Sequence, residues 1–385
     1  MLRTGLLLPR STLFPSLGHD FFNGIKTLLR SERISEDIHF IIDNIGFGIN
    51  EQEIYSKAEK MILQDDADVV LLFADTRIAE MLQPLFTACN KLLLVVNFGA
   101  NFPDNWTPSA TTITHSLNFC WHAALTGTLA AKETNKQAIN TVSYYDGGYR
   151  QCFCMLHAHQ VNGGTPRFNH VTNIKLEDFT LEPVSGFLKE NHDINTLLCL
   201  FSGEQAERFY KEIDALQLQQ MLNLYVSPMM LDETLQPPLY NNVKAVNVKG
   251  YVPWHSSLDN EANTVFKRQY AGVTGNPVNY FSLLGWETGL ILQAILQQYA
   301  AGNKHAASVV TALTTITISG PRGWLKTDAS THHTYGPSYL ASCSGAFDIK
   351  IEVVLNNTEE AWSAFTKTKL YSGESSSWRN TYLCI

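Results

Sequence analysis

The sequence contains no apolar run that approaches the roughly 20 residues needed for a membrane-spanning helix, so we expect no membrane insertion. A signal peptide is also missing, because the first predicted strand begins almost at Met1. Two locations therefore stay open. The chain is either the mature form of a periplasmic protein whose leader has been removed, or a protein that stays in the cytoplasm.

Positive charge is scarce as well. The chain has 28 Lys and Arg against 36 Asp and Glu, a formal net charge of −8 at pH 7. Because phosphate binding needs a basic surface, we expect no nucleic-acid partner. The chain has seven cysteines, an odd number, and their spacing does not match that of a disulfide framework. We expect free thiols, and one bridge between distant cysteines stays open.

Motifs of catalysis and cofactor binding are absent. The sequence contains no GxSxG elbow, phosphate-binding P-loop or HExxH, and no GxGxxG follows the first strand. The pairs His157/His159 and His332/His333 do not make a metal site, since no Cys or carboxylate cluster joins them. We therefore expect no enzyme activity, no cofactor and no metal.

What is present is ordinary globular composition, with 45% hydrophobic and 17% charged residues in 385. This length suits two domains better than one core. The stretch 4–29 shows the repeating unit: an apolar run over 5–8, a polar loop after Pro9, and a helical pattern from about 16. The helical pattern comes from apolar residues at steps of three and four, namely Leu17, Phe21, Ile25 and Leu28.

Such βα units recur in two tandem blocks, about 1–117 and about 118–252. Nearly all-apolar strands predict parallel sheets covered by helices on both faces. Expected strands are 39–43, 68–73, 92–96, 140–144, 168–172, 195–201, 222–226 and 245–252. Expected helices are 51–63, 78–88, 118–133, 149–161, 204–216, 260–270, 280–300 and 306–313, with later strands at 339–342 and 349–355.

No low-complexity or Pro/Gly/Ser-rich linker separates the two blocks. Two domains without a linker favour several short crossings that act as a hinge, and we place these near 117, 252 and 327. Lobe 1 is then 1–117 plus 253–327, and lobe 2 is 118–252 plus 328–355. Residues 356–385 are polar and irregular, which predicts a C-terminal tail on the surface.

Four pieces of the chain resemble the type 1 periplasmic ligand-binding proteins of the leucine/isoleucine/valine-binding kind, which include amide sensors. The first is 5–9 with 16–18 and 23–24, and the second is 74–76 with Pro84. The third and more specific piece runs from Asp259 through 285–287, and the fourth runs from 318–323 to Tyr339. Together they span about 1–345.

The resemblance implies two Rossmann-like α/β lobes, joined by a three-crossing hinge, that close on a small ligand without catalysis. It implies the substrate-binding component of an ABC-type transporter, which delivers an amino acid, branched-chain or related, to a membrane permease. The alternative is a cytoplasmic or receptor-type sensor that binds a small amide or carboxylate and relays it to a regulatory partner.

The resemblance also implies ligand contacts in the loops after the strands. In lobe 1 these are Ser11, Phe14, Leu17, Thr76, Gly99, Ala100 and Asn101. In lobe 2 they are Tyr145, Asp146, Tyr149, Ser202, Gly203, Glu204, Ser227 and Met229, with Trp254 near a hinge crossing. Hydroxyls such as that of Thr76 are alternatively helix N-caps. Asp146 and Glu204 are the candidate partners of an amino group. The third loop of lobe 2 carries Ser-Pro-Met-Met where amino-acid binders often have an acid.

Overall fold

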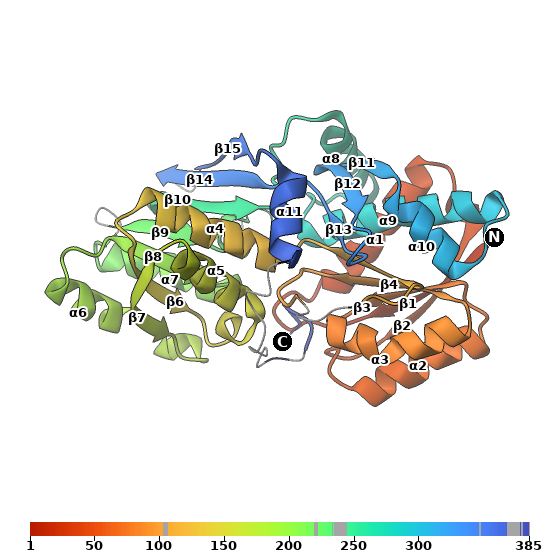
Figure 1. Cartoon of the computed structure of the whole chain (residues 1–385), viewed down its shortest axis with the longest axis horizontal. Coiled ribbons are helices and arrows are strands. Elements are labelled where there is room, and N and C mark those ends of the chain that lie inside the picture. The colour runs from red at the N-terminus through yellow and green to blue at the C-terminus, as the bar shows by residue number, and fades with distance from the viewer. Residues whose placement is uncertain are drawn as a thin grey trace.

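The computed structural model describes residues 1–102, 107–218, 222–232, 234, 245–345, 348–367, 378 and 380–384. Two α/β lobes lie side by side, each with a central sheet and helices packed against it (Figure 1). The helix α11 (Thr358–Lys367) lies across the middle of the molecule between them (Figure 1). The expected fold class is confirmed.

The sheet of lobe 1 is parallel, with strand order β2-β1-β3-β4-β5. Its strands are β1 (Leu2–Leu8), β2 (Ile38–Asn44), β3 (Val69–Phe73), β4 (Leu92–Asn97) and β5 (Thr112–Ser116). Helices α1 (Leu17–Ser31), α2 (Glu51–Leu63) and α3 (Thr76–Ala88) alternate with them. Every residue of β3 and β4 is buried, as an apolar strand covered on both faces requires.

The sheet of lobe 2 has the order β15-β14-β10-β9-β8-β6-β7. Its strands are β6 (Gln137–Val142), β7 (Thr165–Val171), β8 (Thr196–Leu200), β9 (Asn223–Val226), β10 (Ala245–Val252), β14 (Tyr339–Gly345) and β15 (Asp348–Val354). The last two pair in antiparallel fashion at one edge. Its helices are α4 (Phe119–Glu133), α5 (Arg150–Val161), α6 (Glu182–Glu190) and α7 (Gly203–Ala215).

The chain passes between the two sheets at three places. It leaves the first sheet after β5, and it leaves the second after β10 to form α8 (Glu261–Thr274), α9 (Tyr280–Ala300) and α10 (Ala306–Thr314). A small sheet of β11 (Thr317–Gly320), β12 (Gly323–Thr327) and β13 (Thr334–Tyr335) then precedes β14. Short 3-10 helices are η1 (Ser35–Asp37), η2 (Asp146–Gly148), η3 (Leu176–Asp178) and η4 (Pro228–Leu231).

Helix α9 packs on α1 through glycines. A Cβ on Gly285 would lie 1.9 Å from the carbonyl oxygen of Phe21, and one on Gly24 would lie 2.3 Å from that of Ser282. Both glycines belong to the pieces that carry the family resemblance. They therefore allow two helix backbones to approach more closely than any other residue would.

A buried ion pair joins α9 to the turn between β11 and β12. The guanidinium of Arg322 donates from Nη2 to Oε2 of Glu287 at 2.7 Å and from Nε to Oε1 at 2.9 Å. His115 Nε2 lies 3.4 Å from the same carboxylate. Burial holds the pKa of His115 well below its usual value, and the Arg322 charge lowers it further. The third and fourth pieces of the resemblance thus meet in the core.

The C-terminal stretch departs from the surface tail that we expected. Residues 358–367 form a helix with Trp362 and Phe365 buried. Residues 380–384 are also buried, and Leu383 and Cys384 have 0% exposure. Sequence reasoning failed here because a short segment can be buried by distant residues without any periodicity of its own. It also missed α6 and β5.

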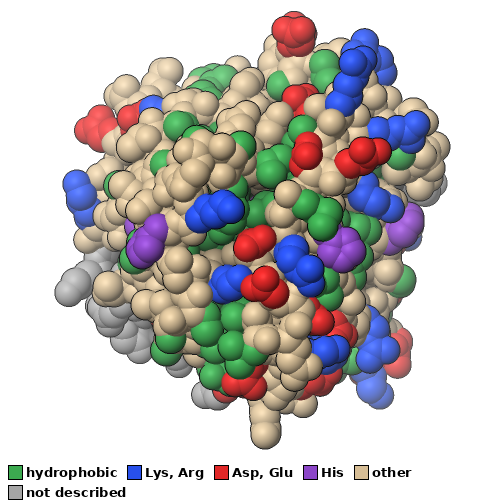
Figure 2. Space-filling model, turned by 90° about the vertical axis from the view of Figure 1, so that its right-hand side faces the viewer, with side chains coloured by type: hydrophobic (Ala, Val, Ile, Leu, Met, Phe, Trp, Pro, Cys, Tyr) green, Lys and Arg blue, Asp and Glu red, His purple; other side chains and the backbone are tan. Residues whose placement is uncertain are grey.

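The outer surface of lobe 1 carries basic and acidic side chains close together (Figure 2). Lys91, for example, lies 2.9 Å from Asp66, and Lys57 lies 2.8 Å from Glu53. Across the described residues, no helix combines the length and hydropathy required to cross a bilayer.

Candidate functional site

Loops at the carboxyl ends of strands from both sheets converge between the lobes. They follow β1 (Ser11, Phe14), β4 (Phe98) and β6 (Tyr145, Tyr149). The end of the chain reaches this same place, where the C label lies between the lobes (Figure 1). Residues Asn380–Cys384, which we call the cleft segment, fill the space between the loops.

Polar groups of both lobes bind the cleft segment. From lobe 1, the hydroxyl of Ser11 donates to the carbonyl oxygen of Leu383 at 2.5 Å. From lobe 2, the hydroxyl of Tyr145 accepts from the backbone N–H of Leu383 at 2.9 Å. The hydroxyl of Tyr149 donates to Oδ1 of Asn380 at 2.8 Å. The segment is therefore hydrogen-bonded across the cleft.

The carboxylate of Asp146 anchors the ring of Tyr382. The Tyr382 hydroxyl donates to Oδ1 of Asp146 at 2.5 Å. Oδ2 accepts from Ser143 Oγ at 2.5 Å and from Ser202 Oγ at 3.0 Å. Burial raises the pKa of Asp146 although these hydrogen bonds lower it. The pKa of Tyr382 is raised well above its ordinary value, chiefly by burial and then by the Asp146 charge.

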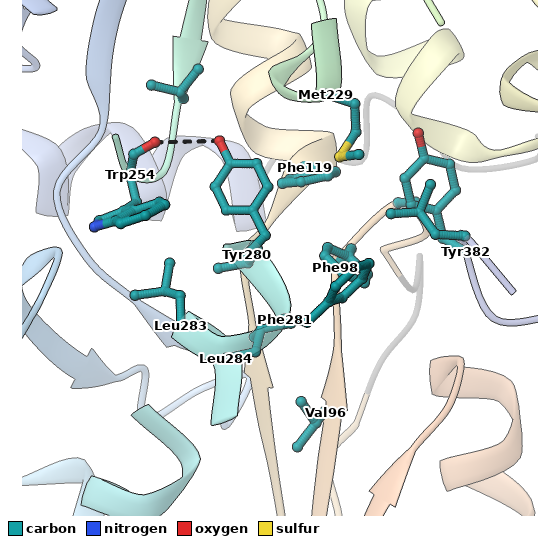
Figure 3. Close-up of a cluster of buried hydrophobic side chains, with 14 of the residues drawn as sticks. Val96, Phe98, Phe119, Met229, Trp254, Tyr280, Phe281, Leu283, Leu284 and Tyr382 are labelled. Carbon is teal, nitrogen blue, oxygen red and sulfur yellow. Dashed lines mark hydrogen bonds between the residues drawn. The ribbon is translucent and has the colours of Figure 1, made fainter. Parts of the chain in front are cut away.

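Aromatic rings surround Tyr382 on its other sides. Its ring centroid lies 4.8 Å from that of Tyr149 in an edge-on arrangement and 6.0 Å from that of Tyr145 in a stacked one. Phe98 and Phe119 each lie 6.2 Å away. Figure 3 shows Phe98, Phe119 and Tyr382 gathered with Phe281 and Tyr280. The site is an apolar, aromatic box with one buried carboxylate.

Five of the predicted residues meet at this box. Ser11, Tyr145, Asp146 and Tyr149 contact the cleft segment directly, and Ser202 supports Asp146.

Phe14 and Met229 lie at its edge. Phe14 packs on Phe281 at 5.4 Å, and Phe281 packs on Phe98 at 5.6 Å. Met229 is buried and lies next to Phe119 (Figure 3).

Ala100 and Asn101 join the lobes directly. The Nδ2 of Asn101 donates to Oδ2 of Asp75 at 2.7 Å, and its Oδ1 accepts from the backbone N–H of Arg150 at 3.0 Å. The carbonyl oxygen of Ala100 accepts from the N–H of Gln151 at 3.0 Å. These groups hold the start of α5 against lobe 1.

The remaining predicted residues lie apart from the box. Asp75 caps α3, and the hydroxyl of Thr76 donates to its Oδ1 at 3.4 Å. Trp254 Nε1 donates to Asn263 Oδ1 at 2.9 Å, and its ring packs on Tyr280. Glu204 is exposed in the first turn of α7.

Others serve the backbone or the core. Gly99 has φ +69° and Gly203 has φ +56°, a region that favours glycine. Leu17 is fully buried in the core, and Ser227 precedes η4.

Sequence reasoning missed Phe98, Phe119 and Tyr382 as members of the site. One signal was available for Tyr382: Trp378, Tyr382 and Leu383 are apolar residues just after the polar run 375–377. An apolar cluster at the end of a polar stretch indicates a docking segment more readily than a solvated tail.

The histidines of the second pair contact backbone carbonyl groups. His332 Nδ1 lies 3.1 Å from the carbonyl oxygen of Thr112, and His333 Nδ1 lies 3.0 Å from that of Thr331. Within the described part of the chain, no group of three His, Cys, Asp or Glu residues is placed to hold a metal ion. The seven cysteines are free thiols.

Solved structures of solute-binding proteins share this fold. One from R. palustris in complex with benzoate has a TM-score of 0.72 at 19% identity, covering 92% of this chain and 96% of its own. One from Rhodopseudomonas palustris HaA2 with p-hydroxybenzoic acid has a TM-score of 0.74 at 15% identity, covering 94% and 98%.

A third is a branched-chain amino acid ABC transporter periplasmic ligand-binding protein from Burkholderia xenovorans LB400. It has a TM-score of 0.75 at 12% identity, covering 96% of this chain and 99% of its own. At these identities the likeness shows the fold alone. No curated protein matches the sequence.

The sequence itself gives the family. The model of a family described as "Periplasmic binding protein" matches residues 2–347, which include every strand of both sheets except the edge strand β15. This is a family of non-enzymatic solute-binding proteins. The chain belongs to the periplasmic binding proteins of type 1, the leucine/isoleucine/valine-binding kind.

Proposed function

We propose that this chain is the substrate-binding component of an ABC-type transporter, and that it binds a small solute in the cleft and presents it to a membrane permease from the periplasm. The observation that carries the proposal is the bonding of one short segment by both lobes. Ser11 holds Leu383 from lobe 1, while Tyr145 and Asp146 hold Leu383 and Tyr382 from lobe 2. A solute that replaced these bonds would stabilise the same closed arrangement.

The lobes in this proposal are 1–117 plus 253–327 and 118–252 plus 328–355, hinged at the three crossings. Closure then follows from differential affinity: a solute that contacts both lobes binds the closed form more tightly and shifts the population toward it. Asn101 and Ala100 add contacts that exist only when the lobes are together.

Two solute classes fit the box. A branched-chain amino acid would place its ammonium on Asp146 and its apolar side chain against Phe98, Phe119 or Met229. An aromatic acid would place its ring among Tyr145, Tyr149 and Phe98. Relatives of the same fold were solved with benzoate and p-hydroxybenzoic acid, and one is named for branched-chain amino acids.

The alternative is a sensor that relays a small amide or carboxylate to a regulatory partner. The cleft segment favours this reading in one respect. A solute that displaces Asn380–Cys384 changes a part of the surface outside the cleft, which a partner protein could read. A transport protein needs no such output.

A thermal-shift panel tests the proposal. The purified chain is heated with leucine, isoleucine, valine, benzoate, 4-hydroxybenzoate and small amides. A solute present at 100 times its Kd adds about 2.7 kcal/mol to the free energy of unfolding, and we expect such a rise with at least one amino or aromatic acid. A hit confined to amides would favour the sensor. No response from any compound contradicts solute binding.

A further inference from the structure

We propose that the cleft segment is an internal ligand, and that Asp146 and the rings around Tyr382 form a phenol-binding subsite for which an external phenolic solute competes with Tyr382. This inference rests on the proposed function, which identifies the cleft as the solute site. It adds which part of the chain fills the cleft and which chemical group the cleft prefers.

The first observation is that the segment touches both lobes as a bound solute would. Besides the bonds of Ser11 and Tyr145 to Leu383, Thr381 packs against the loop after β2: a Cβ on Gly48 would lie 2.5 Å from its Oγ1. On the lobe 2 side, the hydroxyl of Tyr149 donates to Oδ1 of Asn380 at 2.8 Å, and Trp378, which precedes the segment, donates from Nε1 to the carbonyl oxygen of Tyr145 at 2.7 Å. The segment therefore spans the cleft from one wall to the other.

The second observation is the match between the subsite and a phenol. The ring of Tyr382 is enclosed by the rings of Tyr145, Tyr149, Phe98 and Phe119. Its hydroxyl meets a carboxylate that is 1% exposed and already accepts from Ser143 and Ser202. A buried carboxylate that lacked the phenol's donor would lose a charge-assisted hydrogen bond, so the subsite favours a ring with a hydroxyl over a bare ring.

The third observation is that the segment is an imperfect occupant. Leu383 has φ +67°, a left-handed conformation that a β-carbon disfavours. The Nδ2 of Asn380 is buried without a hydrogen-bond partner in the described part of the chain. A solute that satisfied Asp146 without these strains would compete well with the segment.

The test uses the full-length Tyr382→Ala chain and two probes, phenol and benzene. The substitution removes the atoms that phenol itself contains. By thermal shift and calorimetry, we expect phenol to bind this variant at least about tenfold more tightly than benzene, because only phenol restores the hydrogen bond to Asp146. Equal binding of the two probes overturns the proposal.

Two matched variants separate the subsite from a mere cavity. Tyr382→Phe keeps a ring in the subsite that phenol must displace, so phenol should bind this variant more weakly than it binds Tyr382→Ala. Asp146→Asn, combined with Tyr382→Ala, should reduce the preference for phenol over benzene to about twofold or less. A Tyr382→Phe chain that responds like Tyr382→Ala shows that phenol binds elsewhere, and this also overturns the proposal.

A measurement on the unsubstituted chain covers the case in which the variants do not fold. Cys384 has 0% exposure and lies in the cleft segment, while Cys199 is equally buried in β8. If phenol displaces the segment, alkylation of Cys384 by iodoacetamide should speed up at least about fivefold at saturating phenol, and Cys199 should not change. An unchanged rate at Cys384 contradicts displacement.

The two proposals fail in different ways. If the panel of solutes gives no response while phenol binds Tyr382→Ala selectively, solute transport is refuted and the internal ligand stands. If a solute binds the native chain but leaves the labelling of Cys384 unchanged, the transport proposal stands and the internal ligand is refuted.

Discussion

Glu287 and Arg322 show how much a single residue pair contributes to this fold. Both side chains are at most 2% exposed, and they form a bidentate pair across 35 residues of sequence. Breaking such a pair leaves one buried charge without compensation, which costs about 3–5 kcal/mol. The pair joins α9 to the β11–β12 turn, so its loss affects the part of the fold that connects the lobes.

We predict that Glu287→Gln lowers the free energy of unfolding by about 3–5 kcal/mol, measured by urea denaturation. The matched control is Glu359→Gln, which breaks the pair with Lys326 on the surface, where the Glu359 side chain is 59% exposed. Because solvent screens that pair, the control should cost about 0–1 kcal/mol. Equal losses in the two variants would show that the buried pair has no special role.

His333 gives the molecule a sensitivity to acid. Burial lowers the pKa of its imidazole from 6.5 to about 4. The unfolded chain therefore binds a proton at higher pH than the folded chain does, and the stability that His333 contributes is full above pH 6.5 and is lost as the pH falls through about 4. Between about pH 7.5 and about pH 5, the loss from this residue is about 2 kcal/mol.

We expect His333→Asn to make the free energy of unfolding less dependent on pH by about that amount. Urea denaturation at both pH values measures this difference. His39→Asn, at an exposed position on β2, is the control and should leave the pH dependence as it is. A variant that loses stability in acid as steeply as the parent chain would rule out His333 as the source.

At the scale of elements, the contact between α1 and α9 depends on two glycines. We predict that Gly285→Ala lowers the free energy of unfolding by about 3 kcal/mol or more, since its Cβ would meet backbone atoms that cannot move aside. Gly272→Ala in α8, with no atom within 4 Å of its Cβ, should instead add about 0.5–1 kcal/mol. Thermal and urea unfolding of both variants test this, and a neutral Gly285→Ala would contradict the packing.

The sequence predicted most elements because their signals are local. The helices at 51–63 and 280–300 have the bounds expected from apolar periodicity. The apolar strands β3 and β4 agree with the expected 68–73 and 92–96 to within one residue. β5 was missed because its residues, Thr-Ile-Thr-His-Ser, are mostly polar in sequence although every one is buried. Its burial is set by neighbours from elsewhere in the chain.

The site was less accessible from the sequence than the fold. The residues that follow strands β1 and β6 could be placed by the resemblance, and Ser11, Tyr145, Asp146 and Tyr149 do meet. Tyr382 could not be placed, because its position depends on contacts with residues more than 200 positions away. A local sequence pattern does not predict a contact between residues so far apart in the chain.

At the scale of the whole molecule, the two lobes meet over a box of aromatic rings that the chain itself fills. Asn101 and Ala100 join lobe 1 to α5, and the cleft segment joins the loops of both lobes. Solute binding in this arrangement is an exchange of occupants. The affinity for a solute is therefore reduced by the stability of the segment in the cleft.

The most direct measurement is a crystal structure of the full-length chain grown with the solute that gives the largest thermal shift. We expect density for that solute between Ser11 and Phe14 on one side and Tyr145 to Tyr149 on the other, with Asn380–Cys384 moved out of the cleft. Solute density at another surface, with the segment still in place, would contradict this expectation.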